Sequence, residues 1–193
     1  MNVIGNSCVG AYIYKNHLKS NYENPFTWAI VDFNSMFYLI KNYNKIDFNK
    51  FKLIKDAKCN FSIVVDGHVK IDYVHYKLDR TAKKPIKKKF DVFYCKIWEF
   101  IVLKYLERIK RMQKCKDKPI FILANWFNVP ATKLTYDQMK LLDSLKMDNI
   151  ICASDKIYPE FKYIKQIPRE ANKKLYNKGL AKNIYEKFIK DKK

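Results

Sequence analysis

Apolar positions near the start of the chain predict two strand–helix units. Residues 2–5, which contain Val3 and Ile4, are expected to form a short strand, and apolar side chains then recur at helical spacing within residues 8–18. After the turn expected at Asn24-Pro25, residues 26–31 have the composition of a second strand, and Asp32 can cap a second amphipathic helix. The apolar face expected for that helix consists of Phe33, Met36, Phe37 and Ile40.

The middle of the chain contains a β-hairpin signal. Residues 61–65 and 68–76 are rich in β-forming side chains, and Asp66-Gly67 between them is a two-residue sequence favoured in tight hairpin turns. Side chains alternate between the two faces of a strand, so His75 is expected on the face that carries the apolar side chains of the second arm. Those apolar side chains are Val69, Ile71 and Tyr73.

The remainder of the chain predicts three helices and two buried strands. The longest helix is expected from Asp91 to about Met112. Its predicted buried stripe consists of Trp98, Ile101 or Val102, Tyr105, Ile109 and Met112, with Glu107 and Arg111 paired outside. Continuous apolar runs at 120–124 and 149–153 are typical of strands buried on both faces. Thr135 and Gln138 have capping-box spacing for a helix through Leu145, and Pro168 is expected to open a last amphipathic helix.

This order of elements predicts an α/β fold with three layers: a partly parallel central sheet, helices on both faces and one antiparallel hairpin. The length suits a single domain, 1–193, in which 191–193 would be a frayed basic tail. Ligands of such sheets bind at the carboxyl ends of the strands. Here those ends carry Asn6-Ser7-Cys8, Asn125-Trp126 and Ser154-Asp155.

The composition excludes a disordered chain and indicates an anionic partner. Apolar residues make up 48% of the sequence, and the formal net charge is +20. A polyanion, a nucleotide or sugar phosphate, or an anionic membrane surface would be attracted to such a protein. Nucleic acid is the weaker expectation, because only 4 residues are Arg, the side chain best suited to bidentate contacts with bases and phosphates. The sequence does not predict an oligomeric state.

The cysteines and the hydropathy pattern bear on the compartment. Five cysteines, without any C-x-x-C pair, argue for a reducing compartment and against a disulfide framework or a zinc site. The sequence shows neither the pattern of a secretory signal nor an apolar run approaching the ~20 residues that cross a bilayer. We expect a cytoplasmic protein, or one bound peripherally to the inner face of the membrane, with no metal and no cofactor.

Cys8 is the strongest candidate for a chemical centre, because it stands where the first strand gives way to the first helix. Free backbone N–H groups and the helix dipole favour a thiolate or an oxyanion at that position. A cysteine nucleophile also needs a base and a group that orients the base, for which His75 with Asp79 or Asn125 would suffice. Ser7 is the reserve nucleophile. Alternatively, Cys8 is a small buried apolar residue and His75 a core histidine.

A basic stretch follows His75 directly. It runs from Lys77 to Lys89 and contains a single acid, Asp79. Its expected substrate-binding residues are Lys77, Arg80, Lys83, Lys84 and Lys87. One interpretation is a mobile clamp for the phosphate or carboxylate groups of a substrate, and the other is a solvated loop.

Several short motifs resemble the bacterial protein families DUF1919 and DUF1796. The matching segments are Gly5 to Tyr12, Asn24-Pro25-Phe26-Thr27-Trp28, Val74-His75-Tyr76, Trp98-Glu99 and Tyr105 to Met112. The first family is described as exopolysaccharide biosynthesis proteins and the second as papain-like cysteine peptidases, which makes a papain-like α+β fold the alternative architecture. Ser7 differs from the Asn that usually precedes the cysteine.

The resemblance implies an accessory enzyme of bacterial surface polysaccharide biosynthesis, for a capsule or lipooligosaccharide. Cys8 would be the nucleophile of an acyl-type transferase or hydrolase that acts on an anionic glycan precursor, such as a nucleotide sugar. Asn6, Ser7, Trp28 and Tyr76 would join the basic residues in contacting the substrate. The alternative hypothesis is a non-catalytic basic protein that binds anionic glycan, nucleic acid or the inner membrane surface.

Overall fold

The computed structural model describes residues 1–18, 24–27, 29–55, 60–78, 86–88, 92–95, 98–124, 134–168 and 176–192. For residues 55, 60, 74–78, 86–88, 92–95, 98–100, 176–177 and 192 it describes the backbone alone. Four parallel strands form the first sheet, in the order β1 (Val3–Gly5), β7 (Ile120–Ala124), β8 (Ile150–Ser154) and β9 (Lys165–Pro168). The predicted parallel sheet and its two apolar strands are confirmed.

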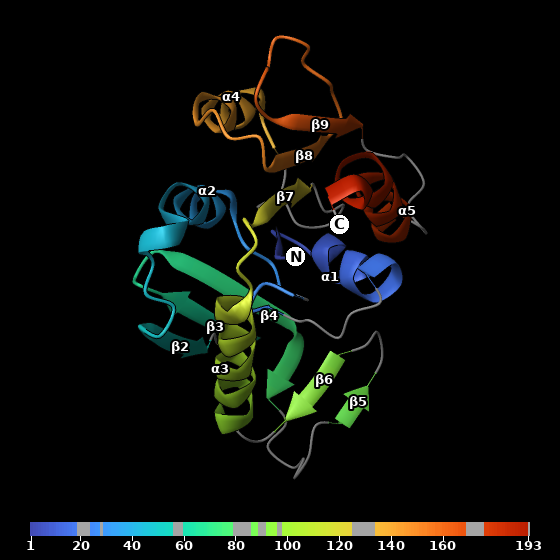
Figure 1. Ribbon diagram of the computed structural model, residues 1–193. Helices are drawn as coiled ribbons and strands as arrows, with labels where there is room; N and C mark the ends of the chain where they lie inside the picture. Colours follow the sequence, from blue (N-terminus) through green and yellow to red (C-terminus); the bar gives the residue numbers. More distant parts are fainter. Residues whose placement is uncertain are drawn as a thin grey trace.

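Helices cover both faces of the parallel sheet, which confirms the three-layer α/β expectation (Figure 1). On one face α1 (Val9–Ile13) packs beside α5 (Tyr176–Ile184); the π-helical turns Tyr14–Leu18 and Tyr185–Ile189 follow them, and the 3-10 turn Lys190–Lys192 comes last. The other face carries α2 (Phe33–Asn42) and α4 (Tyr136–Ser144). Along β7, Ile120 and Ile122 belong to the core cluster that includes side chains of α1 and α5, whereas Phe121 and Leu123 belong to the cluster that includes side chains of α2 and α4. This alternation explains the unbroken apolar sequence of the strand, since both of its faces are buried.

A second sheet has the order β2 (Phe51–Lys55), β3 (Asn60–Val65), β4 (Val69–Leu78), β6 (Val92–Cys95) and β5 (Ile86–Lys88). Its β3–β4 pair is the predicted hairpin, and the turn residues Asp66 and Gly67 have φ angles of 49° and 74°. Strands β4 and β6 pair in parallel, so the second sheet is mixed.

The hairpin register changes just before His75. Phe61 of β3 pairs with Tyr73, but the preceding residue, Asn60, pairs with Lys77. The backbone of β4 therefore contains an irregularity over residues 74–76. Val69, Ile71 and Tyr73 are buried as predicted. The sequence placed His75 on the same face of the strand as these three side chains, on the assumption that side chains alternate regularly. Regular alternation does not continue across a change of register, so that prediction for His75 no longer follows.

The strand predicted at 26–31 is wrong. Residues 25–27 form a turn, and Ile30 makes only an isolated bridge to Asp72 of β4. The buried amide of Asn24 holds the turn: its Oδ1 accepts from the backbone N–H of Phe26 (3.0 Å), and its Nδ2 donates to the carbonyl of Val3 (2.7 Å). These side-chain bonds to the backbone replace the strand ladder that the apolar composition predicted.

The helix caps follow the prediction, whereas two helix starts do not. Oδ1 of Asp32 accepts from the N–H of Ser35 (3.0 Å), and Thr135 with Gln138 forms the expected capping box. The long helix α3 (Trp98–Lys114) begins seven residues later than predicted, because the β-forming residues 92–95 pair with β4 and β5. Pro168 ends β9 instead of opening a helix, and α5 begins at Tyr176.

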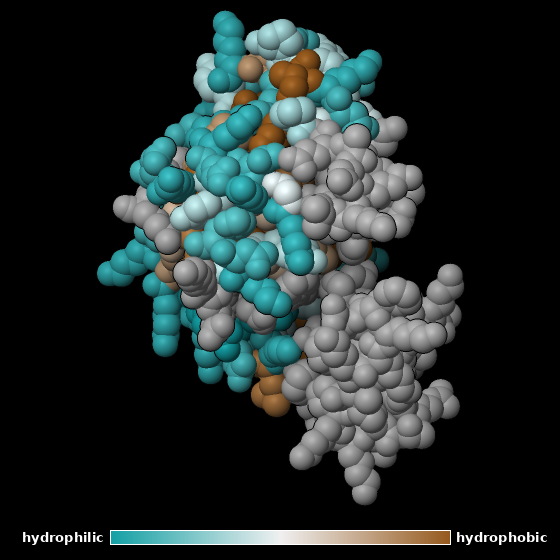
Figure 2. All heavy atoms as spheres, turned by 90° about the vertical axis from the view of Figure 1, so that its right-hand side faces the viewer, coloured by the Kyte–Doolittle hydropathy of each residue, from teal (hydrophilic) through white to brown (hydrophobic). Residues whose placement is uncertain are grey.

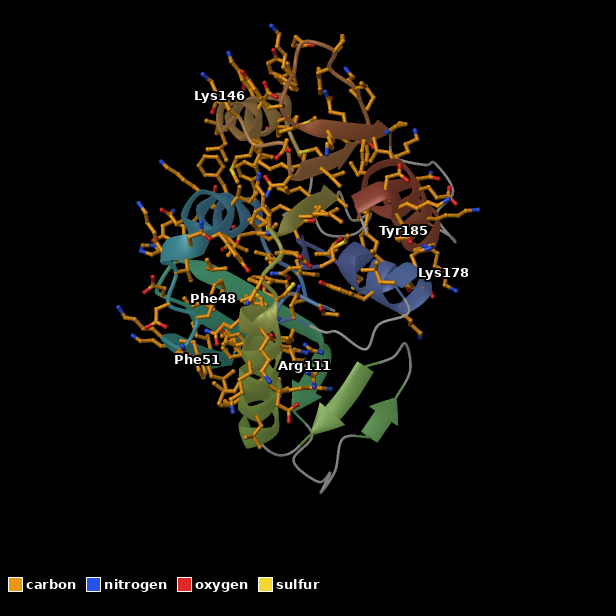
Figure 3. All side chains as sticks on the ribbon, viewed as in Figure 1. Phe48, Phe51, Arg111, Lys146, Lys178 and Tyr185 are labelled. Atoms are coloured by element: carbon orange, nitrogen blue, oxygen red, sulfur yellow. The ribbon has the colours of Figure 1, made fainter. Side chains whose placement is uncertain are left out.

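The second sheet and α3 share a core with the parallel sheet. The hydroxyl of Tyr105 in α3 donates to the carbonyl of Phe48 (3.0 Å), and its ring packs on Phe51 at 4.7 Å between centroids. Figure 3 shows Phe48 and Phe51 beside α3. These side chains belong to, or pack against, the core cluster that also contains Ile4 of β1 and Phe121 of β7.

Candidate functional site

The carboxyl ends of β1, β7 and β8 meet at one edge of the parallel sheet. The register pairs Gly5 with Ile122 and Ala124 with Ala153, so the three strands end side by side. The residues that follow β1, and Ser154 at the end of β8, therefore occupy the edge at which α/β sheets bind ligands. The sequence predicted that the residues after β1 and β8 lie at the same edge, and this is confirmed; Asn125-Trp126, predicted there too, lie outside the described residues.

A tight turn joins β1 to α1. A Cβ atom on Gly5 would lie 3.1 Å from the carbonyl of Ser7 and 3.2 Å from the backbone nitrogen of Gly10. The Oδ1 of Asn6 accepts a hydrogen bond from the backbone N–H of Ala124 (2.8 Å), and Asn6 and Ser7 are 1% and 2% exposed. The amide of Asn6, which was predicted to contact substrate, thus supports the end of β7.

Cys8 lies at the N-cap of α1 and is 3% exposed. Burial raises the pKa of its thiol to about 12, and a backbone hydrogen bond opposes the rise only in part. At neutral pH the sulfur is therefore protonated. As a nucleophile it would have to transfer its proton to a base at the moment of attack, because no standing thiolate is available.

The two sheets connect close to both members of the predicted pair. The backbone N–H of Val31 donates to the carbonyl of Asn6 (3.1 Å), and Ile30 exchanges two backbone hydrogen bonds with Asp72 (2.9 and 2.8 Å). Asn6 and Asp72 are thus two strand spacings apart, about 10 Å. Cys8 follows Asn6 by two residues, and His75 follows Asp72 by three.

The other predicted site residues are described less completely. His75, Tyr76 and Lys77 lie in β4 and Lys87 in β5, where the backbone alone is described. Because residues 86–88 form a strand, this part of the basic stretch is not the loop that the sequence indicated. Six residues lie outside the described ranges: Trp28, Asp79, Arg80, Lys83, Lys84 and Asn125.

Sequence reasoning missed a buried cation. Arg108 of α3 is 2% exposed, donates from Nη1 to the carbonyl of Thr27 (3.2 Å) and lies 5.9 Å from the ring centroid of Tyr73. The hydroxyl of Tyr73 in turn donates to the carbonyl of Pro25 (2.7 Å). Arg108 stands three residues after the buried Tyr105, so helical spacing was a usable signal. The guanidinium of Arg108 therefore holds the turn at residues 25–27, which comes just before the bridge between Ile30 and Asp72.

The two other histidines of the chain stack on tyrosine rings. His68 is exposed and stacks on Tyr38 at 4.2 Å, and His17 stacks on Tyr185 at 5.0 Å. Among the described residues, no three His, Cys, Asp or Glu side chains are grouped as metal ligands would be. Within the same ranges, none of the helices combines the length and apolarity that a membrane crossing requires.

One face of the described surface is mainly hydrophilic, and the protein as a whole carries a large positive charge. The described residues on the face drawn in Figure 2 are mainly hydrophilic, and the net charge is +20.

The chain was compared with models of protein families and with curated proteins, and it matches none of them. The resemblance to DUF1919 and DUF1796 stays a prediction.

Proposed function

We propose that this protein is a cytoplasmic or inner-membrane-associated accessory enzyme of bacterial surface polysaccharide assembly that acts on an anionic glycan precursor. The observation that carries the proposal is the position of Cys8, at the carboxyl edge of a parallel sheet and close to the junction with β4, which bears His75. The excess of basic residues favours an anionic substrate.

The chemistry proposed is acyl-type transfer or hydrolysis. The Cys8 sulfur attacks the carbonyl carbon as His75 takes the thiol proton, and His75 then returns the proton to the leaving group. Water or a sugar hydroxyl next attacks the thioester carbonyl as His75 takes its proton, the carbon–sulfur bond breaks, and His75 returns the proton to the Cys8 sulfur. The buried, protonated thiol requires the base to act directly on it, so activity depends on His75 as strictly as on Cys8.

Turnover of activated acyl esters and of acylated nucleotide sugars by Cys8→Ala, Cys8→Ser and His75→Gln tests this proposal. We expect each variant to lose at least about 100-fold in rate, the lower end of what general-base and nucleophilic catalysis contribute. Cys152→Ala, which removes a thiol buried in β8, is the matched control and should retain the rate if the protein stays folded. Equal rates in the wild type and both Cys8 variants would exclude the nucleophile.

A second candidate is favoured by the burial of Cys8: a non-catalytic protein that binds anionic glycan. This function needs no thiol, and it predicts affinity that falls steeply with salt and is unchanged in Cys8→Ala. Binding of a uronate-containing oligosaccharide, measured between about 50 and 500 mM salt, distinguishes the two, because the Debye length falls from roughly 14 Å to roughly 4 Å over that range. Salt-insensitive binding would remove this candidate.

A further inference from the structure

A cavity lies at the other end of the parallel sheet. It has a volume of about 540 Å³ and is lined by the end of α2, by the 3-10 turn η2 (Tyr43–Lys45), by the connection from α3 to β7, and by residues next to β8. Figure 1 shows α2 beside this connection. Residues 116–119 immediately precede β7, so the cavity is separated from the carboxyl edge by the length of that strand, roughly 16 Å.

The rim of the cavity is strongly basic. Lys41, Lys45, Lys116 and Lys118 line it together with a single carboxylate, Asp117. The α-amino group of Met1 pairs with Asp117 (2.6 Å), and Lys118 pairs with Asp148 (2.9 Å).

The other three lysines have no acidic partner in the part of the chain that the structure describes. Among the described residues no carboxylate lies within ion-pair distance of Lys41, Lys45 or Lys116. Lys41 lies in α2, Lys45 in η2 and Lys116 in the segment before β7, so an anionic group bound in the cavity would be attracted from more than one side.

The floor of the cavity suits a ring. Ile40, Tyr43, Phe121 and Met147 line it, and the rings of Tyr43 and Phe121 meet edge to face at 5.7 Å. Because Ile40 and Phe121 are buried, a bound ring would rest on the half-buried side chains of Tyr43 and Met147. Nδ2 of Asn2 donates to the Tyr43 hydroxyl (2.8 Å), which leaves the hydroxyl proton available to a ligand. Burial raises the pKa of Tyr43, so the hydroxyl keeps that proton.

A buried polar atom of a lining residue supports the same ligand class. Asn149 lines this cavity and a smaller one of about 190 Å³ that adjoins it. Its Nδ2 donates to the carbonyl of Pro119 (2.7 Å), while its buried Oδ1 has no hydrogen-bond donor among the described residues. A buried acceptor is normally satisfied, and the hydroxyls of a sugar or nucleoside are donors of the required kind.

We infer that this cavity binds a phosphate monoester carried on a sugar or nucleoside ring. The lysines hold the phosphate, and the apolar floor takes the ring. The volume lies within the range usual for small-molecule sites. This site is separate from the one proposed for catalysis, so neither proposal depends on the other.

Titration calorimetry with four probes tests the inference: uridine monophosphate, glucose 1-phosphate, inorganic phosphate and uridine. We expect at least one of the two esters to bind more tightly than phosphate, and uridine not to bind. In Lys45→Glu/Lys116→Glu the affinity for that ester should fall at least about tenfold, because two attractive charges become repulsive.

The matched control is Lys52→Glu/Lys140→Glu, which changes the net charge equally at exposed lysines of β2 and α4. Affinity there should change less than about twofold. Equal weakening in both double variants would reveal a general charge effect and overturn the inference, as would failure of both esters to bind the wild type. If Lys45→Glu/Lys116→Glu has a lower melting temperature than the wild type, the affinity is measured in Lys45→Met/Lys116→Met instead. Cys8→Ala should leave the affinity unchanged, which separates this test from that of catalysis.

Discussion

The side chain of Asn6 accepts a hydrogen bond from the backbone of Ala124 at 2.8 Å, across 118 residues of sequence. The backbone N–H of Asn6 already donates to Ile122 (3.0 Å), so the amide side chain supplies the next rung between β1 and β7. One asparagine thereby aligns the two strands whose carboxyl ends border the candidate site.

Replacing Asn6 by Ala should destabilise the protein by about 1–3 kcal/mol, because the N–H of Ala124 would be left buried without its acceptor. Urea denaturation measures the change. Asn16→Ala, at an exposed position in the turn after α1, is the control and should change stability by less than about 0.5 kcal/mol. Equal effects of the two substitutions would contradict the role given to Asn6.

The two glycines of the β1–α1 turn should respond differently to alanine. Gly5→Ala places a Cβ 3.1 and 3.2 Å from backbone atoms that cannot move independently, and a loss of about 1–3 kcal/mol is expected. At Gly10 the nearest atom would be 3.5 Å away, an ordinary contact, and helix propensity favours alanine by up to about 1 kcal/mol. Thermal unfolding of both variants checks the contrast, which fails if Gly10→Ala is the more damaging change.

Arg108 and Arg111 form a matched pair on α3. Arg108→Ala removes a buried guanidinium that bonds the carbonyl of Thr27, so a loss of about 2–4 kcal/mol is expected. Arg111, which Figure 3 labels, is 44% exposed and 3.6 Å from Glu107. Its substitution by Ala should cost no more than about 0.5 kcal/mol. Chemical denaturation of the two variants gives the comparison, and similar losses would mean that Arg108 is not anchored as described.

Alkylation should distinguish the thiols of Cys8 and Cys115. With a pKa of about 12, roughly one Cys8 thiol in 10⁵ is ionised at pH 7, and the side chain is also buried. Cys115 is partly exposed and serves as an internal control. At pH 8 iodoacetamide should modify Cys8 at least about 100-fold more slowly than Cys115, as followed by peptide mass spectrometry. Comparable rates would indicate a standing thiolate at Cys8.

The raised pKa of Cys8 also makes the free energy of unfolding depend on pH in the alkaline range. The pKa of Cys8 is higher in the folded protein than in the unfolded chain, so its stabilising contribution is complete below about pH 9 and is lost as pH rises toward 12. The fall in unfolding free energy between pH 8 and roughly pH 11 should therefore be smaller in Cys8→Ala than in the wild type. Parallel pH profiles for the two proteins would show that the thiol does not titrate differently on folding.

The sequence by itself determined the features that depend on neighbours in the chain. Asp32 and Thr135 cap helices through side chains that reach three residues ahead, and Asp66-Gly67 turns the hairpin with its own backbone angles. The apolar run of β7 specified burial on both faces, and the order of strands and helices specified a parallel sheet with ligand-binding ends at one edge.

Only the tertiary structure decided the rest, because partners distant in sequence supply the energy. Residues 26–31 were kept from forming a strand by the bonds of Asn24, and residues 92–95 were drawn into a sheet by β4. Tertiary burial set the protonation of Cys8, and the carbonyl of Thr27 and the ring of Tyr73 supplied the partners of Arg108. The basic cavity likewise joins lysines from α2, η2 and the segment before β7, whose separation along the chain conceals their proximity in space.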